Sequence, residues 1–111
     1  MEFSEHASFT REFGRLFKRF KSLDDDLEKI KKILLKQPAG TDGRHWNVLH
    51  RSEQCVIFKT RMMCRYLRHG DLRLIYAYFP TEGRVEFIEI YFKGDKESED
   101  GKRIADYLKR F

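Results

Sequence analysis

The stretch that most constrains this chain runs from Val56 to Lys96 and contains three strand-like runs. Each run is rich in β-branched and aromatic residues and is bounded by Gly, Asp or Pro, which is typical of β-strands. We expect strands at 56–65, 72–79 and 85–92. Residues 80–83 have the composition of a tight turn, so the second and third strands should form an antiparallel hairpin.

The alternation of side chains in these runs predicts the two faces of the sheet. The first run alternates apolar with mainly basic residues, and the second is apolar on both faces apart from Arg73. The third run places Ile88, Ile90 and Phe92 on one face and Phe87, Glu89 and Tyr91 on the other. The exposed face should therefore carry basic and aromatic side chains, namely Lys59, Arg61, Arg65, Tyr91 and Lys93.

Two amphipathic helices are expected before the sheet. Apolar residues recur at helical spacing from Phe9 to Phe20, with Ser8 as the predicted N-cap. A second helix should follow, with Ser22 as its predicted N-cap, and we interpret Asp24–Asp26 as its acidic first turn rather than a metal cluster, because lysines follow toward its end. The helices should pack on one face of the sheet through Phe13, Phe17, Leu27, Ile30 and Leu34.

The remaining segments complete the predicted order. Residues 2–7 fit a short edge strand, and a short final helix should begin near residues 98–100 and bury Ile104 and Leu108, with Phe111 as a further candidate. Residues 44–54 have no clear periodicity, and we expect Trp46, Val48 and Leu49 to attach them to the core. The prediction is an α+β fold of order β-α-α-β-β-β-α, in one small domain over residues 1–111, with one sheet face free of helices.

The net charge of +5 is concentrated in residues 44–79. Seven Lys or Arg residues face only two Asp or Glu residues there, which leaves sixteen of each sign in the rest of the chain. Localised positive charge on a sheet predicts a polyanionic partner, either nucleic acid or an acidic protein segment. A solvated basic face that serves only solubility remains the alternative.

No apolar run approaches the ~18 residues that a membrane span requires, and the N-terminus lacks a signal-peptide pattern, so we expect a cytosolic protein. Cys55 and Cys64 have an odd spacing that would point them to opposite faces of a strand, which disfavours a disulfide. His45 and His50 lack the cysteine or carboxylate pattern of a zinc site, and we expect no metal or other cofactor.

Three segments in order resemble the RelE/ParE toxin superfamily of bacterial type II toxin–antitoxin systems. They are Lys59-Thr60-Arg61, the stretch from Gly70 to Tyr76, and the stretch from Ile88 to Lys96. The resemblance covers roughly Val56 to Ile104, and the preceding helix pair fits the family's order of elements. It implies a RelE-like fold, a cytosolic toxin and a cognate antitoxin that binds it in a hetero-oligomer.

The family contains two activities, and the sequence leaves both open. The RelE-like branch cleaves mRNA in the ribosomal A site, where the neighbouring 2′-hydroxyl attacks the scissile phosphate without a metal. The ParE-like branch inhibits DNA gyrase. A third possibility is a fold relative that binds antitoxin or nucleic acid and has lost the chemistry.

For the RelE-like branch, the resemblance assigns roles to particular residues. The reaction needs a base, an acid and cations that stabilise the developing phosphorane charge. Lys59, Arg61 and Arg73 match the family's basic strand residues. Tyr91 is a candidate for the missing late tyrosine or histidine, since Tyr107 falls in the final helix. The expected nucleic-acid contacts are Arg65, Arg68, Lys93 and Lys96.

Structural roles remain open for the same residues. Arg73 could pair with Glu89 across the hairpin, Tyr91 could be a packing residue, and the other cations could be solvated, with Glu89 as a surface partner. The sequence also departs from the family pattern at Met62–Gly70, which we expect to be a longer and more basic loop.

Overall fold

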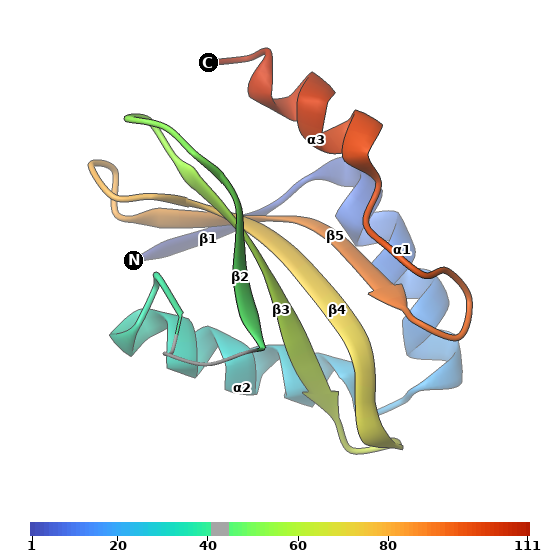
Figure 1. Cartoon of the computed structure of the whole chain (residues 1–111). Coiled ribbons are helices and arrows are strands. Elements are labelled where there is room, and N and C mark those ends of the chain that lie inside the picture. Colours follow the sequence, from blue (N-terminus) through green and yellow to red (C-terminus); the bar gives the residue numbers. More distant parts are fainter. Residues whose placement is uncertain (41–44) are drawn as a thin grey trace.

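The computed structural model describes residues 1–40 and 45–111, and for residues 68–71 it describes the backbone alone. The elements follow the order β1 (Glu2–Glu5), α1 (Ala7–Arg19), α2 (Leu23–Lys36), β2 (Trp46–Arg51), β3 (Val56–Cys64), β4 (Leu67–Phe79), β5 (Arg84–Phe92) and α3 (Gly101–Leu108) (Figure 1). In this part of the chain the strands form a five-stranded sheet of order β1-β5-β4-β3-β2. β1 runs parallel to β5, and the other neighbours are antiparallel. The predicted α+β fold, edge strand and hairpin are confirmed.

The turn between β4 and β5 has the geometry that its sequence predicts. Gly83 adopts a φ of 61°, a left-handed conformation that favours glycine. Its N–H donates to the carbonyl of Phe79 at 2.9 Å, which closes the turn. The turn thereby sets the hairpin that carries Arg73 and Tyr91 on neighbouring strands.

β2 is a strand that the sequence pattern did not predict. It pairs antiparallel with β3, and a register shift between Val48 and His50 breaks the alternation that would have revealed it. Trp46 attaches the strand to the core, because its indole N–H donates to the hydroxyl of Tyr76 at 2.8 Å. Leu49 is partly buried, whereas Val48 is 46% exposed, so its predicted attachment is wrong. Residues 41–44 of the predicted polar segment lie outside the described residues.

The predicted loop from Met62 to Gly70 is instead a hairpin with a short turn. β3 ends at Cys64 and β4 begins at Leu67. Asp26 of α2 fixes the turn, because its carboxylate accepts from the backbone N–H of Arg65 at 3.3 Å and from the Ser22 hydroxyl at 2.6 Å. Ser22 therefore occupies the N-cap position of α2 without capping it by a side-chain hydrogen bond.

A bulge in β5 changes the predicted faces of that strand. Ile75 lies opposite Glu89, but the next residue, Tyr76, lies opposite Phe87, which leaves Ile88 as an extra residue. Phe87 and Ile90 both join the core beneath the helices, whereas Ile88 faces the other side. The prediction that Ile88 and Ile90 share a face is therefore wrong.

α1 and α2 cover one face of the sheet, as predicted. Their core contacts include Phe9, Leu27, Ile30 and Leu34, and the partly buried Phe13 and Phe17 pack against the same cluster. α1 begins earlier than expected, at Ala7, since the Nδ1 atom of His6 accepts from the backbone N–H of Ser8 at 3.1 Å and caps the helix. The predicted Ser8 cap is wrong, because Ser8 lies inside the first turn.

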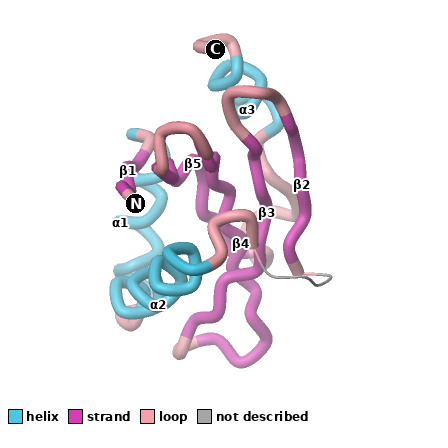
Figure 2. The backbone as a smooth tube through the Cα atoms, turned by 90° about the vertical axis from the view of Figure 1, so that its left-hand side faces the viewer, coloured by secondary structure: helices cyan, strands magenta, loops and turns pink. Residues whose placement is uncertain are grey.

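α3 packs on the opposite face of the sheet (Figure 2). Its Tyr107 is buried against a second apolar cluster made of Cys55, Ile57, Ile75, Ala77, Phe79 and Ile88. The expectation that this face carries no helix is therefore wrong at this end. Ile104 and Leu108 are partly buried there as predicted, whereas Phe111 is 50% exposed. Cys55 and Cys64 belong to different clusters, which confirms that they lie on opposite faces.

Candidate functional site

The part of the second face that α3 leaves open carries two cross-strand rows of mainly polar residues. In the first row, Arg61 of β3 lies opposite Arg73 of β4, and Arg73 lies opposite Tyr91 of β5. In the second row, the residues in strand order are Asn47, Lys59, Ile75 and Glu89. Antiparallel register thus brings together Lys59, Arg61, Arg73 and Tyr91 on one face, as the alternation predicted.

A pocket of about 210 Å³ opens over these rows, and we call it the basic pocket. Its lining residues are His45, Asn47, Lys59, Thr60, Arg61, Arg73 and Lys93. Four of the eight predicted site residues therefore meet in one place, and all four are cations. Converging cations and polar donors of this kind suit a phosphate-sized anion.

The two arginines of the basic pocket face each other directly across the β3–β4 pair. Like charges in that position repel each other. The Nε atom of Arg61 is buried and has no hydrogen-bond partner among the described residues. A buried donor without a partner is costly, and an anion bound between the arginines would relieve both effects.

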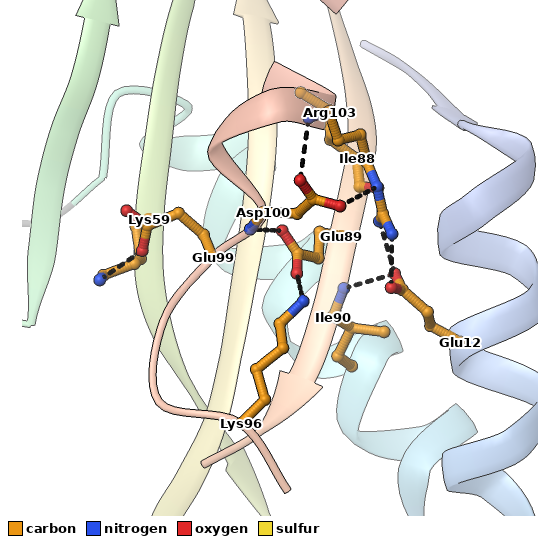
Figure 3. A network of polar contacts seen from close by, with 9 residues as sticks. All are labelled: Glu12, Lys59, Ile88, Glu89, Ile90, Lys96, Glu99, Asp100 and Arg103. Carbon is orange, nitrogen blue, oxygen red and sulfur yellow. Dashed lines mark hydrogen bonds and ion pairs between the residues drawn. The ribbon is translucent and has the colours of Figure 1, made fainter. Parts of the chain in front are cut away.

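Lys59 forms an ion pair with Glu99, which precedes α3 (Figure 3). The Nζ and Oε1 atoms are 2.7 Å apart, and each side chain is about a quarter exposed, at 24% and 23%. This hydrogen bond raises the pKa of Lys59 above its ordinary value and lowers the pKa of Glu99. Lys59 is therefore a cation at neutral pH and a hydrogen-bond donor, not a base.

Glu89 is fully buried in the middle of this face. Its carboxylate accepts from the backbone N–H of Asp100 at 2.9 Å and from the ammonium of Lys96 (Figure 3). The register places it opposite Ile75, whereas the predicted partner Arg73 faces Tyr91. Glu89 is thus a buried anchor for the segment that follows β5, and the expectation of a surface partner is wrong.

Arg103 fixes the start of α3 to the body of the protein. Its guanidinium makes two hydrogen bonds to the carboxylate of Glu12 on α1, both at 2.8 Å, and a third to the carbonyl of Ile88 at 3.1 Å (Figure 3). Asp100 caps the helix by accepting from the backbone N–H of Arg103 at 3.0 Å. These bonds hold α3 and the residues just before it beside the basic pocket.

Tyr91 is only 5% exposed, and its hydroxyl has no hydrogen-bond partner among the described residues. Burial raises the pKa of this hydroxyl, which therefore stays protonated at neutral pH. The ammonium of Lys96 lies over its ring, 5.2 Å from the centroid. Packing explains the burial of the ring, but it does not explain a buried donor without an acceptor.

No protein-family model matches the sequence, and no curated protein matches it by sequence. Two solved structures share its architecture. The archaeal RelE–RelB complex from Pyrococcus horikoshii OT3 superposes with a TM-score of 0.62 at 15% identity, over 84% of this chain and 94% of that chain. The isolated E. coli RelE toxin gives a TM-score of 0.57 at 18% identity, over 98% and 96% of the two chains. The chain has the RelE fold.

Within this RelE fold, the other predicted nucleic-acid contacts are dispersed. Lys96 pairs with Glu89 and lines a separate pocket between α1 and β5, not the basic pocket. Arg65 lies in the β3–β4 turn, where its guanidinium is 3.6 Å from the carboxylate of Asp25 on α2, so its predicted place on the exposed face is wrong. The side chain of Arg68 lies outside the described residues.

His45 and Asn47 line the basic pocket but were not predicted as site residues. Both belong to the β2 segment, whose strand character the sequence pattern did not reveal. The available signal is their position in the most basic part of the chain, although the pattern around His45 argues only against a zinc site and indicates no other role. Imidazole is the side chain most often used for proton transfer near neutral pH, so His45 adds a candidate acid or base.

The described residues contain no group of three or more His, Cys, Asp or Glu placed to hold a metal ion. No helix formed by these residues combines the length and apolar character needed to cross a membrane.

Proposed function

We propose that this chain is the toxin of a type II toxin–antitoxin pair and that it cleaves mRNA in the ribosomal A site. The basic pocket is the observation that supports this proposal, because Lys59, Arg61 and Arg73 converge there on a RelE fold. A phosphodiester is the natural ligand of such a cluster, since each cation can donate hydrogen bonds to phosphate oxygens.

The proposed reaction breaks the RNA chain without a metal. The 2′-hydroxyl next to the scissile phosphate attacks phosphorus, and the 5′-oxygen of the following nucleotide leaves, which yields a cyclic phosphate and a 5′-hydroxyl end. The pentavalent transition state carries more negative charge than the substrate. Arg61 and Arg73 stabilise that charge, and Lys59 donates to a phosphate oxygen.

Two proton transfers accompany this reaction, and there is one candidate for each: His45 in the basic pocket, and Tyr91, which lies opposite Arg73 on β5. The imidazole of His45 takes the proton of the attacking hydroxyl. Tyr91, which burial keeps protonated, gives a proton to the leaving oxygen. A hydroxyl held without another acceptor is available for that transfer.

A cognate antitoxin is the proposed protein partner, since the archaeal relative was solved as a RelE–RelB complex. It would bind over the basic face or the helix pair. A second, larger pocket of about 430 Å³ between α2 and the end of β3 supports the latter, with Ile33 and Met63 exposed beside it. The cytoplasm, where translation takes place, is the location that this function requires.

The test is a primer-extension assay on mRNA in a translation extract that contains the purified protein. We expect cuts inside codons of translated messages, and intact RNA when translation is blocked before A-site entry. Arg73→Ala should remove the cuts. Intact mRNA during active translation would contradict the proposal, and a parallel DNA-gyrase supercoiling assay would then reveal the ParE-like alternative.

A further inference from the structure

The segment between β5 and α3 lines the basic pocket through Lys93 and contacts its Lys59 through Glu99, and we call residues 93–100 the strap. The strap begins at Lys93, which lines the pocket, and ends at Asp100, whose N–H is bound to the buried Glu89. Just before that anchor, Glu99 extends its carboxylate to Lys59 (Figure 3). A carboxylate of the strap therefore forms an ion pair with one of the cations of the basic pocket.

We propose that Glu99 masks the basic pocket in the free protein, where its carboxylate takes the place of an RNA phosphate, and that RNA binds when this carboxylate is displaced. The inference deepens the proposed function and rests on it for the identity of the ligand. Glu99 is then a gating residue, and RNA competes with the protein's own carboxylate for Lys59.

The geometry of the ion pair between Glu99 and Lys59 supports this masking role. A carboxylate oxygen 2.7 Å from an ammonium has the distance of a charge-assisted hydrogen bond, which a phosphate oxygen would also make. Lys96, another lysine of the strap, is likewise paired, with Glu89. The pairs cancel two positive charges that the resemblance assigned to substrate or nucleic acid.

The unpartnered polar groups of this face are an independent observation. The buried Nε of Arg61 and the buried hydroxyl of Tyr91 have no hydrogen-bond partner within the described residues. Native proteins satisfy nearly all such groups, so two in one face indicate a site without its ligand. Glu99 supplies the charge of a phosphate to Lys59 but does not reach these two groups, whereas a bound phosphodiester offers further oxygens.

The anchors that follow Glu99 in the chain restrict what has to move. Asp100 is held by Glu89 and caps α3, and Arg103 holds the helix to Glu12. Before Glu99, residues 97 and 98 are exposed. Displacement of the mask therefore needs a new side-chain conformation of Glu99 and leaves α3 in place.

Glu99 also suits a mask better than a general base. Its ion pair with Lys59 lowers the pKa of the carboxyl group, which weakens it as a proton acceptor. A base in this position would lose activity when neutralised, whereas a mask would release the site.

The experiment compares the full-length protein with Glu99→Gln and with the matched control Glu97→Gln, an exposed strap residue. The probe is a short 2′-fluoro RNA, which lacks the attacking hydroxyl and so reports binding alone. Fluorescence anisotropy at low ionic strength should show about 2- to 10-fold tighter binding for Glu99→Gln. Glu97→Gln should bind like the wild type. In a Lys59→Ala background, Glu99→Gln should have no effect, because the partner of the mask is gone.

Equal affinity of the wild type and both single variants, including no measurable binding by any of them, overturns the mask. Weaker RNA cleavage by Glu99→Gln without tighter binding also overturns it, because Glu99 then acts as the base. Tighter binding without cleavage by any variant leaves the mask standing and contradicts the nuclease proposal. Thermal melting of the two glutamine variants verifies that both remain folded.

Discussion

The two faces of the sheet are built from the same strands but are completed in different ways. The face beneath α1 and α2 is filled by apolar side chains from both layers, among them Phe9, Leu34, Phe58 and Phe87. The opposite face is apolar only near α3 and elsewhere holds the buried Glu89 and the basic pocket. The larger apolar cluster thus lies on one face of the sheet, and the buried polar groups without a partner among the described residues lie on the other.

The largest effect is expected on the helix-covered face. Leu27→Ala should lower the free energy of unfolding by ~2–5 kcal/mol, because Leu27 is 5% exposed and its loss leaves a cavity in the core. Chemical denaturation measures this loss. The control is Leu35→Ala on the same helix, which should cost below ~0.5 kcal/mol because Leu35 is 53% exposed. Equal effects of the two variants would show that the helix pair is peripheral.

Substitutions on the open face should reduce the rate of cleavage and change the free energy of unfolding little. Arg73→Ala is expected to slow single-turnover cleavage of mRNA in the ribosomal A site by about 10²–10³-fold, because the variant loses a cation that stabilises the transition state. Its free energy of unfolding should change by less than about 1 kcal/mol, because relief of the repulsion from Arg61 offsets the loss of the hydrogen bond from Arg73 to the carbonyl of Leu72. Lys59→Ala and Arg61→Ala should each slow cleavage, and together by less than the product of their separate effects.

The matched control for Arg73 is Arg51→Ala, an exposed cation on the edge strand β2 outside the basic pocket. It should cleave like the wild type. Arg84 is unsuitable, because its guanidinium lies 3.8 Å from the ring centroid of Phe79 and its loss would disturb packing. An Arg73→Ala protein that unfolds would make this arginine structural, and a folded protein with full activity would refute the proposed site.

Local patterns in the sequence predicted the parts of the fold that depend on nearby residues. The alternation in β3 and β4 correctly placed Lys59, Arg61 and Arg73 on one face, and the helical spacing predicted the core contacts of α1 and α2. The errors arise where one inserted residue shifts a register. The bulge at Ile88 and the shift after Val48 have no signature in composition, so the faces of Phe87 and Ile88 were predicted wrongly and β2 was not predicted, whereas Ile90 and Tyr91 lie on the predicted faces.

In the candidate site, sequence patterns also fail to predict contacts between residues that are far apart in the chain. Lys59 and Glu99 are forty residues apart in the chain, and their contact depends on how α3 is anchored by Arg103 and Glu12. No local pattern reports such an anchor. Sequence could therefore propose the cations of the site, but only the three-dimensional structure could supply the carboxylate that pairs with one of them.

The smallest effect expected is also the most discriminating, because it compares two buried tyrosines on the same face. The hydroxyl of Tyr107 donates to Glu86, whereas that of Tyr91 has no partner among the described residues. Tyr107→Phe should therefore destabilise the protein by ~1 kcal/mol, whereas Tyr91→Phe should leave stability unchanged or raise it by up to ~1 kcal/mol. Denaturant titration of both variants measures whether each substitution lowers or raises the free energy of unfolding.

The activity of the same two variants then separates packing from catalysis. If Tyr91 donates a proton to the leaving oxygen, Tyr91→Phe should slow cleavage by at least ~10²-fold while the protein becomes no less stable. Tyr107→Phe should cleave at the wild-type rate once the fraction folded is taken into account. A stable Tyr91→Phe protein with full activity would show that Tyr91 is a packing residue. A group of the basic pocket would then have to be the general acid. Opposite signs in stability, with activity lost only in the Tyr91 variant, would instead show that the missing hydrogen-bond partner of Tyr91 is its substrate.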